Sequence, residues 1–172
     1  PTNTIPTVSR LVPAKITVSL RDELNDTINY IQLANQLRES PIEHSLSMDA
    51  WTEQHLADVQ VPRLILQPIV ENAVRHGLVK RAVGYISIDL KRTEDTLVIQ
   101  VEDNGVGMNE EQLAAVQQNL QENQNEENGS AHGLGLANVI KRLDFQFPGR
   151  STFDIQSQPS VGTRVIIRIQ IS

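Results

Sequence analysis

A single asparagine and a single histidine interrupt the apolar segment Gln67-Pro-Ile-Val-Glu-Asn-Ala-Val-Arg-His-Gly77. With a helical rotation of about 100° per residue, Asn72 and His76 lie one turn apart at the edge of the buried arc, and Arg75 lies nearer solvent. A polar side chain at a core margin needs partners, because an unsatisfied amide costs on the order of 1–3 kcal/mol. Asn72 either caps a neighbouring loop or offers its carbonyl oxygen to Mg²⁺, which prefers hard oxygen ligands beside substrate phosphates. In the second interpretation, Arg75 and His76 donate hydrogen bonds to those phosphates.

A carboxylate and two glycines follow a predicted strand in the segment Asp103-Asn-Gly-Val-Gly107. Asp103 has the parity of the inward apolar residues of that strand, so its carboxylate should be buried and must meet a donor. The exocyclic amine of adenine is such a donor. Gly105 and Gly107 would let the backbone approach a flat ring closely, and Met108 would pack against that ring. The alternative is an ordinary tight turn, because Asp-Asn-Gly is a common turn sequence.

The segment Gly133-Leu134-Gly135-Leu136 stands at the start of a predicted helix. Glycine N–H groups at a helix N-terminus form a site for anions, and the alternative is a helix entry without a ligand. The context excludes a dinucleotide-binding loop, because Asn138 occupies the third glycine position and no strand directly precedes it. Thr163 shares the parity of the inward residues of the last strand. Its hydroxyl either binds the same base as Asp103 or only satisfies the backbone.

The helices and strands that must position these residues follow from hydrophobic periodicity. Residues 1–18 contain three prolines and predict a linker or an extended lead-in. A capping box at Ser19 opens a helix that ends near Arg38, and its broad apolar face predicts packing against the domain itself or a partner helix. A second helical pattern covers residues 63–78, where Pro68 predicts a kink or a late helix start.

Alternating apolar and polar residues predict strands at residues 42–48, 86–90, 97–101, 152–157 and 165–171. Further helices are predicted from Asn109 and from about Leu134. Between them, residues 121–131 contain no large apolar residue, so this segment has nothing to anchor it in a core and should be mobile. The pattern predicts a two-layer α/β sandwich in which a mixed sheet is backed by helices.

Composition bounds the class of protein. A chain of 172 residues fits one domain, and its net charge of −6, with scattered Lys and Arg, argues against nucleic acid or an anionic membrane as the main partner. The absence of cysteine excludes a disulfide framework and Cys-ligated zinc and is compatible with a reducing compartment. No apolar run approaches the roughly 20 residues of a membrane span, and no signal peptide is visible. The chain starts at Pro1 rather than Met, so we expect a fragment of a longer protein.

The order of these segments resembles a known superfamily. The asparagine helix, the D-x-G-x-G strand end, the G-x-G helix start and the Gly-Thr strand are similar to the N, G1, G2 and G3 boxes of the nucleotide-binding fold shared by DNA gyrase, Hsp90, histidine kinases and MutL. Within that superfamily, the segment 66–77, the pattern Leu24…Tyr30…Arg38 and the segment 133–139 are most similar to sensor histidine kinases of the LytS/YesM type. The resemblance covers roughly residues 15–172. It implies the Bergerat, or histidine kinase ATPase-type, fold.

The resemblance implies a role for each residue by its position in the boxes. It makes Asn72 the Mg²⁺ ligand, with Arg75 and His76 beside the phosphates, and these three form the implied catalytic set. It makes Asp103 the carboxylate that reads adenine. The other residues implied to contact the nucleotide are Gly105, Gly107, Met108, Gly133, Leu134, Gly135, Leu136 and Thr163. Residues 121–131 match the ATP lid, and ATP and Mg²⁺ are the implied cofactors.

Three departures from the family pattern bear on activity. The phosphoacceptor histidine of these kinases stands in an upstream Asn-Pro-His-Phe motif, and no histidine of this chain has that context, so the acceptor is missing here. The ATPase relatives place a water-activating Glu four residues before the Asn, where this chain has Pro68. Hydrolysis should therefore be slow, whereas transfer to a histidine nitrogen relies mainly on positioning and charge stabilisation and should lose little. Ala131 and His132 stand where the G2 box often begins with an extra glycine, so lid flexibility should differ.

The resemblance implies the ATP-binding catalytic domain of a two-component sensor histidine kinase, with residues 1–18 as a linker, 19–40 as the helix leading from the dimerisation region and 41–172 as the ATP-binding catalytic domain. The γ-phosphoryl group of Mg-ATP would pass to a histidine on the dimerisation helices of its own or a partner subunit, and then to a response regulator. We expect the cytoplasmic domain of a bacterial inner-membrane sensor, which at full length is a membrane-associated homodimer. The rivals are another ATPase or serine kinase of the superfamily, such as an anti-sigma factor kinase, and a degenerate nucleotide-binding scaffold.

Overall fold

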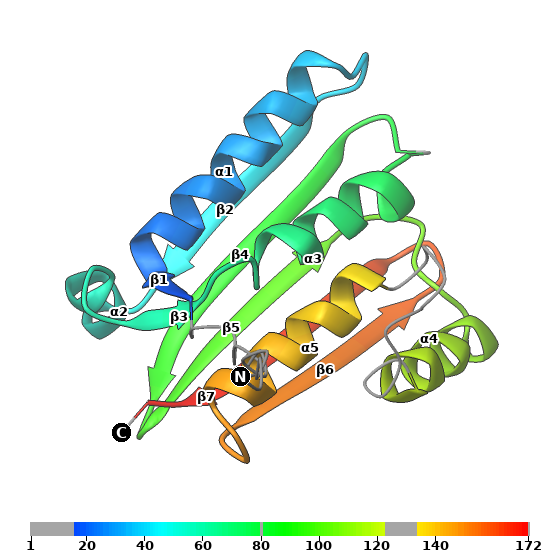
Figure 1. Cartoon of the computed structure of the whole chain (residues 1–172). Coiled ribbons are helices and arrows are strands. Elements are labelled where there is room, and N and C mark those ends of the chain that lie inside the picture. Colours follow the sequence, from blue (N-terminus) through cyan, green and yellow to red (C-terminus); the bar gives the residue numbers. More distant parts are fainter. Residues whose placement is uncertain (1–15, 80, 123–133, 172) are drawn as a thin grey trace, which may run out of the picture.

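The structure, a computed structural model, describes residues 16–79, 81–122 and 134–171. Its main sheet has five strands in the order β2-β4-β5-β7-β6 (Figure 1). These strands are β2 (Ile42–Met48), β4 (Gly84–Thr93), β5 (Thr96–Asp103), β6 (Ser151–Gln158) and β7 (Gly162–Gln170). Strands β2 and β4 pair in parallel, and the other neighbours pair antiparallel. The predicted mixed sheet is therefore confirmed.

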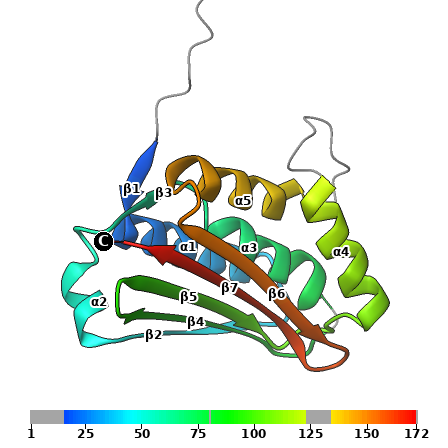
Figure 2. The ribbon, with the colours of Figure 1, turned by 90° about the horizontal axis from the view of Figure 1, so that it is seen from below.

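Helices form the second layer and cover one face of this sheet (Figure 2). They are α1 (Leu20–Gln36), α3 (Gln67–Asn72) with its π-helical continuation η1 (Ala73–Gly77), and α5 (Leu134–Gln146). Helix α4 (Glu110–Glu122) packs against α5 and β6. Three elements were not anticipated from the sequence: the short antiparallel strands β1 (Thr17–Ser19) and β3 (Gln60–Pro62), and the helix α2 (Ala50–His55). The predicted two-layer α/β sandwich is confirmed.

Apolar side chains between the two layers hold the sandwich together. Strand β5 buries every second residue, and its register with β7 places Ile99 opposite Ile167, both fully buried. Asp103 ends β5 with the same inward parity. Because successive side chains of a strand point to opposite faces, the alternation that built the core also carries this carboxyl group to the core margin.

Helix α1 belongs to the same hydrophobic core as the sheet. Ser19 caps it by accepting the Asp22 N–H at 3.1 Å, as the capping box predicted. Its residues Leu20, Leu24 and Ile31 are buried in the main cluster, so the helix packs against the domain itself. The division into segments 19–40 and 41–172 stays a prediction.

The remaining expectations on local structure have mixed outcomes. Helix α3 begins at Gln67, which confirms a late start, and Pro68 lies in its first turn, where the missing N–H costs little. Of the predicted linker, residues 1–15 lie outside the described residues, and the end of it forms β1. Of the predicted lid, residues 121–122 end α4 and the others lie outside the described part of the chain. None of the described helices combines the length and apolar character that crossing a membrane requires.

Replacing Leu24 by alanine tests whether α1 belongs to the folding unit. Leu24 is 2% exposed, so Leu24→Ala should lower the free energy of unfolding by about 2–5 kcal/mol, measured by urea denaturation. Leu37→Ala is the matched control, because Leu37 caps the C-terminal end of α1 and is 91% exposed. Equal midpoints for both variants and the wild type would show that α1 does not belong to the core.

Candidate nucleotide-binding site

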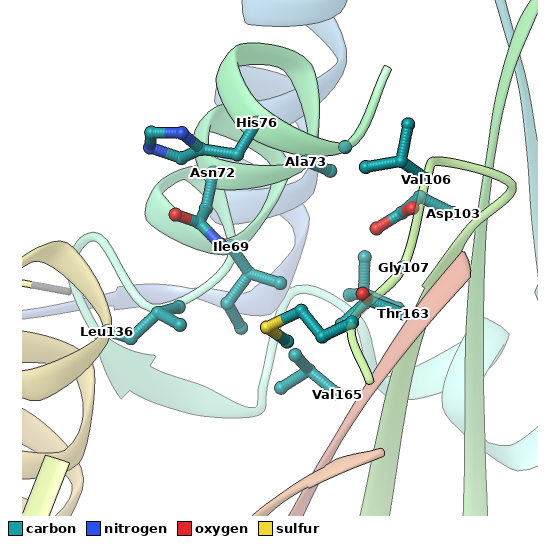
Figure 3. A pocket seen from close by; sticks show the side chains of 13 residues that line it. Ile69, Asn72, Ala73, His76, Asp103, Val106, Gly107, Leu136, Thr163 and Val165 are labelled. Atoms are coloured by element: carbon teal, nitrogen blue, oxygen red, sulfur yellow. The ribbon is translucent and has the colours of Figure 1, made fainter. Parts of the chain in front are cut away.

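A pocket lies between the helix α3–η1, the loop after β5 and the inward face of β5 and β7 (Figure 3). The predicted site residues that line it are Asn72, His76, Asp103, Gly107, Met108, Leu136 and Thr163. A neighbouring pocket shares four of these residues and extends to Val116 and Asn119 of α4. The two pockets therefore form one depression that runs from the sheet margin toward α4.

Asp103 points into this pocket from the end of β5 (Figure 3). The residue is 8% exposed, and the Gly105 N–H donates to its Oδ1 at 2.8 Å. Burial raises the pKa of this carboxyl to about 6, against the opposing effect of the N–H groups of Gly105 and Thr163, and the nearby Glu102 raises it further. Neither ion pair within the described ranges includes Asp103. A desolvated carboxylate bonded by main-chain N–H groups retains acceptor capacity for a ligand.

The loop after β5 packs backbone to backbone against the end of η1. The Val106 N–H donates to the Gly77 carbonyl at 2.9 Å. A Cβ on Gly105 would lie 2.5 Å from the Gly77 backbone, and a Cβ on Gly107, whose φ is +64°, would overlap the carbonyl oxygen of Gln158. These contacts therefore require glycine at both positions. Only Gly107 lines the pocket, so Gly105 acts on it by allowing the loop to pack.

Arg81 holds the same loop, and the sequence analysis missed it. Its Nη2 donates to the Gly105 carbonyl at 3.0 Å and to the Ser160 carbonyl at 2.7 Å. The side chain thereby joins the loop after β5 to the turn between β6 and β7. Arg81 stands outside every periodic segment and every box, so no signal in the sequence marked it.

Helix α3 and η1 direct Asn72 and His76 toward the pocket (Figure 3). Arg75 does not line the pocket: its guanidinium pairs with Glu71 at 3.3 Å on the exposed side of the helix. Because consecutive residues are about 100° apart around a helix, Arg75 and His76 leave α3–η1 on different sides. The predicted grouping of Arg75 with Asn72 and His76 is therefore not seen in the structure.

Thr163 has an unexpected partner in Ser157. The Ser157 Oγ donates to the Gly162 carbonyl at 2.9 Å, accepts the Met108 N–H at 2.9 Å and lies 2.9 Å from the Thr163 Oγ1. Because a serine hydroxyl has one hydrogen, Thr163 must donate in the bond that they share. The lone pairs of Thr163 are then free to accept from a donor in the pocket. Ser157 is one of several polar residues in β6, and nothing in the sequence distinguished it.

The glycine-containing start of α5 is described in part. Gly133 lies outside the described residues, and α5 begins at Leu134. Gly135 is exposed, and Leu136 is 2% exposed and lines both pockets. The N-terminal end of α5 thus faces the same depression as Asn72, and an anion site at this end stays a prediction.

The residues at the pocket fit a metal ion that is bound mainly by substrate phosphates and water. Within the described ranges, no group of three or more His, Cys, Asp and Glu residues could hold a metal ion. Mg²⁺ is commonly bound by one or two protein oxygens together with substrate phosphates and waters. The side-chain carbonyl of Asn72, which lines both pockets, can supply one such oxygen.

Curated relatives of this chain are sensor kinases. The sensor protein kinases HptS of Staphylococcus aureus strains bovine RF122 / ET3-1 and USA300 are each 27% identical to it over 150 residues. The match covers 87% of this chain and 28% of each relative, so the chain spans little more than a quarter of their length.

Solved structures share the fold at low sequence identity. The catalytic domain of histidine kinase ThkA matches with a TM-score of 0.59 and 16% identity, over 90% of this chain and 94% of that one. The histidine kinase domain of a blue-light activated kinase from Erythrobacter litoralis EL346 matches with a TM-score of 0.55 and 20% identity, over 87% of this chain and 61% of that one.

A family model provides the decisive match. The model of the histidine kinase-, DNA gyrase B-, and HSP90-like ATPases matches residues 57–172. This range contains every residue that lines the pocket described above. The chain therefore belongs to the family of histidine kinase-, DNA gyrase B-, and HSP90-like ATPases.

Proposed function

We propose that this chain is the ATP-binding catalytic domain of a two-component sensor histidine kinase. It passes the γ-phosphoryl group of Mg-ATP to a histidine outside residues 1–172, on dimerisation helices of the same or a partner subunit, and a response regulator receives the group next. The observation that carries this proposal is the buried carboxyl of Asp103, which faces the same pocket as Asn72. The sensor kinases among the relatives favour this branch of the family.

The finer assignment is part of the same proposal. The segment 66–77 and the segment 133–139 favour sensor kinases of the LytS/YesM type. In that setting, the chain is the cytoplasmic domain of a membrane-associated bacterial homodimer, and α1 leads from its dimerisation region.

Asp103 and Thr163 together suit one amino group. Both present oxygen lone pairs to the pocket, and the exocyclic amine of adenine has two hydrogens to donate. Gly107 and Met108 line the space beside them, where a flat ring would pack. Guanine carries a carbonyl oxygen at the equivalent position, so its acceptor would face two acceptors. The pocket therefore favours adenine.

The other residues of the proposed site position the phosphates. Asn72 would hold magnesium through its carbonyl oxygen, and His76, one turn further on, would donate to the phosphates. Leu136 in the first turn of α5 lines both pockets, and the first N–H groups of this helix would favour negative charge. Magnesium, when bound, neutralises charge that develops between the β- and γ-phosphates. Positioning and charge stabilisation are most of what phosphoryl transfer requires.

Pro68 favours transfer over hydrolysis. It occupies the position four residues before Asn72, where an ATPase would need a base for water. Among the described residues that line the two pockets, Asp103 is the only carboxylic acid, and its proposed role is to bind the base of the nucleotide. No second carboxylate among these residues is thus available to activate water.

The function is tested by mixing this chain with γ-labelled ATP, Mg²⁺ and a separately made acceptor-helix segment of the same sensor protein. Acid-labile phosphohistidine should form on the acceptor segment, and a segment with His→Gln at the acceptor is the control. Label found only as free phosphate would indicate an ATPase, and label on serine would indicate a serine kinase.

Asp103→Asn should weaken the binding of Mg-ATP. The amide presents an NH₂ group or a weaker acceptor to the adenine amine, so the Kd for Mg-ATP should rise about tenfold or more. Isothermal titration calorimetry measures this change. A Kd equal to that of the wild type would mean that Asp103 does not read adenine.

The same variant should not lose stability at neutral pH. Because the pKa of Asp103 in the folded chain is about 6, above the ordinary carboxyl value of about 3.9, its favourable contribution exists below the ordinary value and is lost as the pH rises through 6. At pH 8 the ion is desolvated, so Asp103→Asn should match the wild type or exceed it by up to about 3 kcal/mol. Urea denaturation at pH 8 and pH 4 measures the difference, which should shrink at pH 4. A large loss at pH 8 would contradict the assigned pKa.

Asn72→Ala should act through the metal. With Mg²⁺ present, the Kd for ATP should rise about tenfold, the effect of losing one ligand interaction of about 1.4 kcal/mol. With EDTA present, the variant and the wild type should bind ATP equally, and this is the internal control. Equal losses in both conditions would show that Asn72 contacts the nucleotide rather than a metal.

A further inference from the structure

A buried glutamate caps the helix that carries Asn72. Glu23 of α1 is 1% exposed, and its carboxylate accepts three consecutive backbone N–H groups: Leu64 at 3.1 Å, Ile65 at 2.9 Å and Leu66 at 3.0 Å. Within the described ranges it takes part in no ion pair. A carboxylate so far from water is stable only where strong donors surround it, and here three main-chain N–H groups do so.

These three N–H groups belong to the turn that starts α3. Leu66 is the N-cap of α3 and has no side-chain cap of its own, and Pro68 in the first turn has no N–H to donate. Leu64 has a φ of 61°, in the left-handed region that a leucine rarely adopts. The cap for α3 thus comes from another helix, and it stabilises an otherwise unfavourable turn.

The carbonyl of the same Leu64 accepts a bond from the third helix of the layer. Arg142 of α5 donates to it through Nη1 at 2.8 Å. The N–H and the carbonyl of Leu64, which precedes α3, are therefore bonded to α1 and α5 respectively. The three helices α1, α3 and α5 lie side by side on the sheet (Figure 1). Helix α3 carries Asn72, and the first turn of α5 carries Leu136 at the pocket.

A second contact extends the hold of α1 to the far end of the same helix. Arg38, just after α1, donates through Nη2 to the Leu78 carbonyl at 3.2 Å. Leu78 directly follows η1. Residues in and next to α1 therefore hold both ends of α3–η1.

We propose that Glu23 and Arg142 are positioning residues for the nucleotide site. By fixing the Leu64 turn, they set the position of Asn72 relative to the start of α5, and hence of the metal relative to the phosphates. Asp103 is held by the sheet and the loop after β5, so adenine recognition does not depend on them. The inference rests on the proposed assignment of Asn72 to the metal.

The test compares Mg-ATP and adenosine binding to the whole 172-residue chain. Glu23→Gln removes one acceptor oxygen of the cap, and Arg142→Met removes the donor to Leu64 while keeping most of the side-chain volume. Each should raise the Kd for Mg-ATP by up to about tenfold, the loss expected for Asn72→Ala, because both residues act through the position of Asn72. The Kd for adenosine, measured by NMR titration, should stay at the wild-type value.

Two exposed positions supply matched controls. Asp26→Asn removes a carboxylate from the exposed side of α1, and Arg168→Met removes a guanidinium from the exposed face of β7. Both should bind Mg-ATP and adenosine like the wild type. Thermal unfolding of every variant shows how much of the chain is folded at the titration temperature.

Two outcomes for the folded variants overturn the inference. If Glu23→Gln and Arg142→Met lower the unfolding temperature but leave both Kd values unchanged, their role is in stability alone. If the Kd for adenosine rises as much as that for Mg-ATP, the whole pocket has loosened. If Glu23→Gln does not fold, Arg142→Met decides alone. A wild-type chain that binds no Mg-ATP would overturn the proposed function as well, whereas failure of the variants alone would leave that function intact.

Discussion

A carboxyl group that the fold removes from water is the constraint on which the site depends. Asp103 completes the inward row of β5, is 8% exposed and has a pKa raised by burial to about 6. The chain thereby carries a charge at neutral pH that its own contacts only partly compensate, and a donor from outside would complete them. The surroundings pack closely around this carboxyl: a Cβ on Gly77 would lie 3.0 Å from the Asp103 Oδ1, and the glycines at 105 and 107 let the loop close over the strand end. The buried charge of Asp103 thus lowers the stability of the folded chain at the position where we propose that a ligand binds.

The two layers of the sandwich contribute differently to the site. The register of the sheet places Asp103 and Thr163 opposite one another, and both line the pocket. The helices bring Asn72 and the start of α5 to the other side, and their mutual position depends on a few polar contacts, of which those at Leu64 are the most direct. The position of Asn72 therefore depends on contacts of α1, whereas that of Asp103 depends on the sheet.

Much of this arrangement could be predicted from sequence because it depends on the spacing of apolar residues within single strands and helices. Strand alternation placed Asp103 and Thr163 on the inward face, and helical spacing placed Asn72 and His76 together. Contacts between distant segments could not be predicted. Arg81 and Ser157 act on the pocket through backbone groups far away in sequence. In the sequence, Glu23 looks like any other charged residue of a helix. Arg75 lies outside the pocket lining and pairs with Glu71, since the neighbour of a site residue on a helix faces about 100° away, and its role beside the phosphates stays a prediction. The boundary drawn after residue 40 stays a prediction, because a helix that completes a core looks the same in sequence as one that leaves it.

The account is tested most directly by the titration of Asp103 itself. The carboxyl carbon of this residue can be followed by NMR across the acid range, in the free chain and with saturating Mg-ATP, using Asp103→Asn to assign the signal. The account predicts a pKa of about 6 in the free chain, and a clearly lower pKa in the complex, because a donor on adenine stabilises the ionised form. An ordinary carboxyl pKa in the free chain, unchanged by nucleotide, would mean that Asp103 neither is desolvated nor contacts the base.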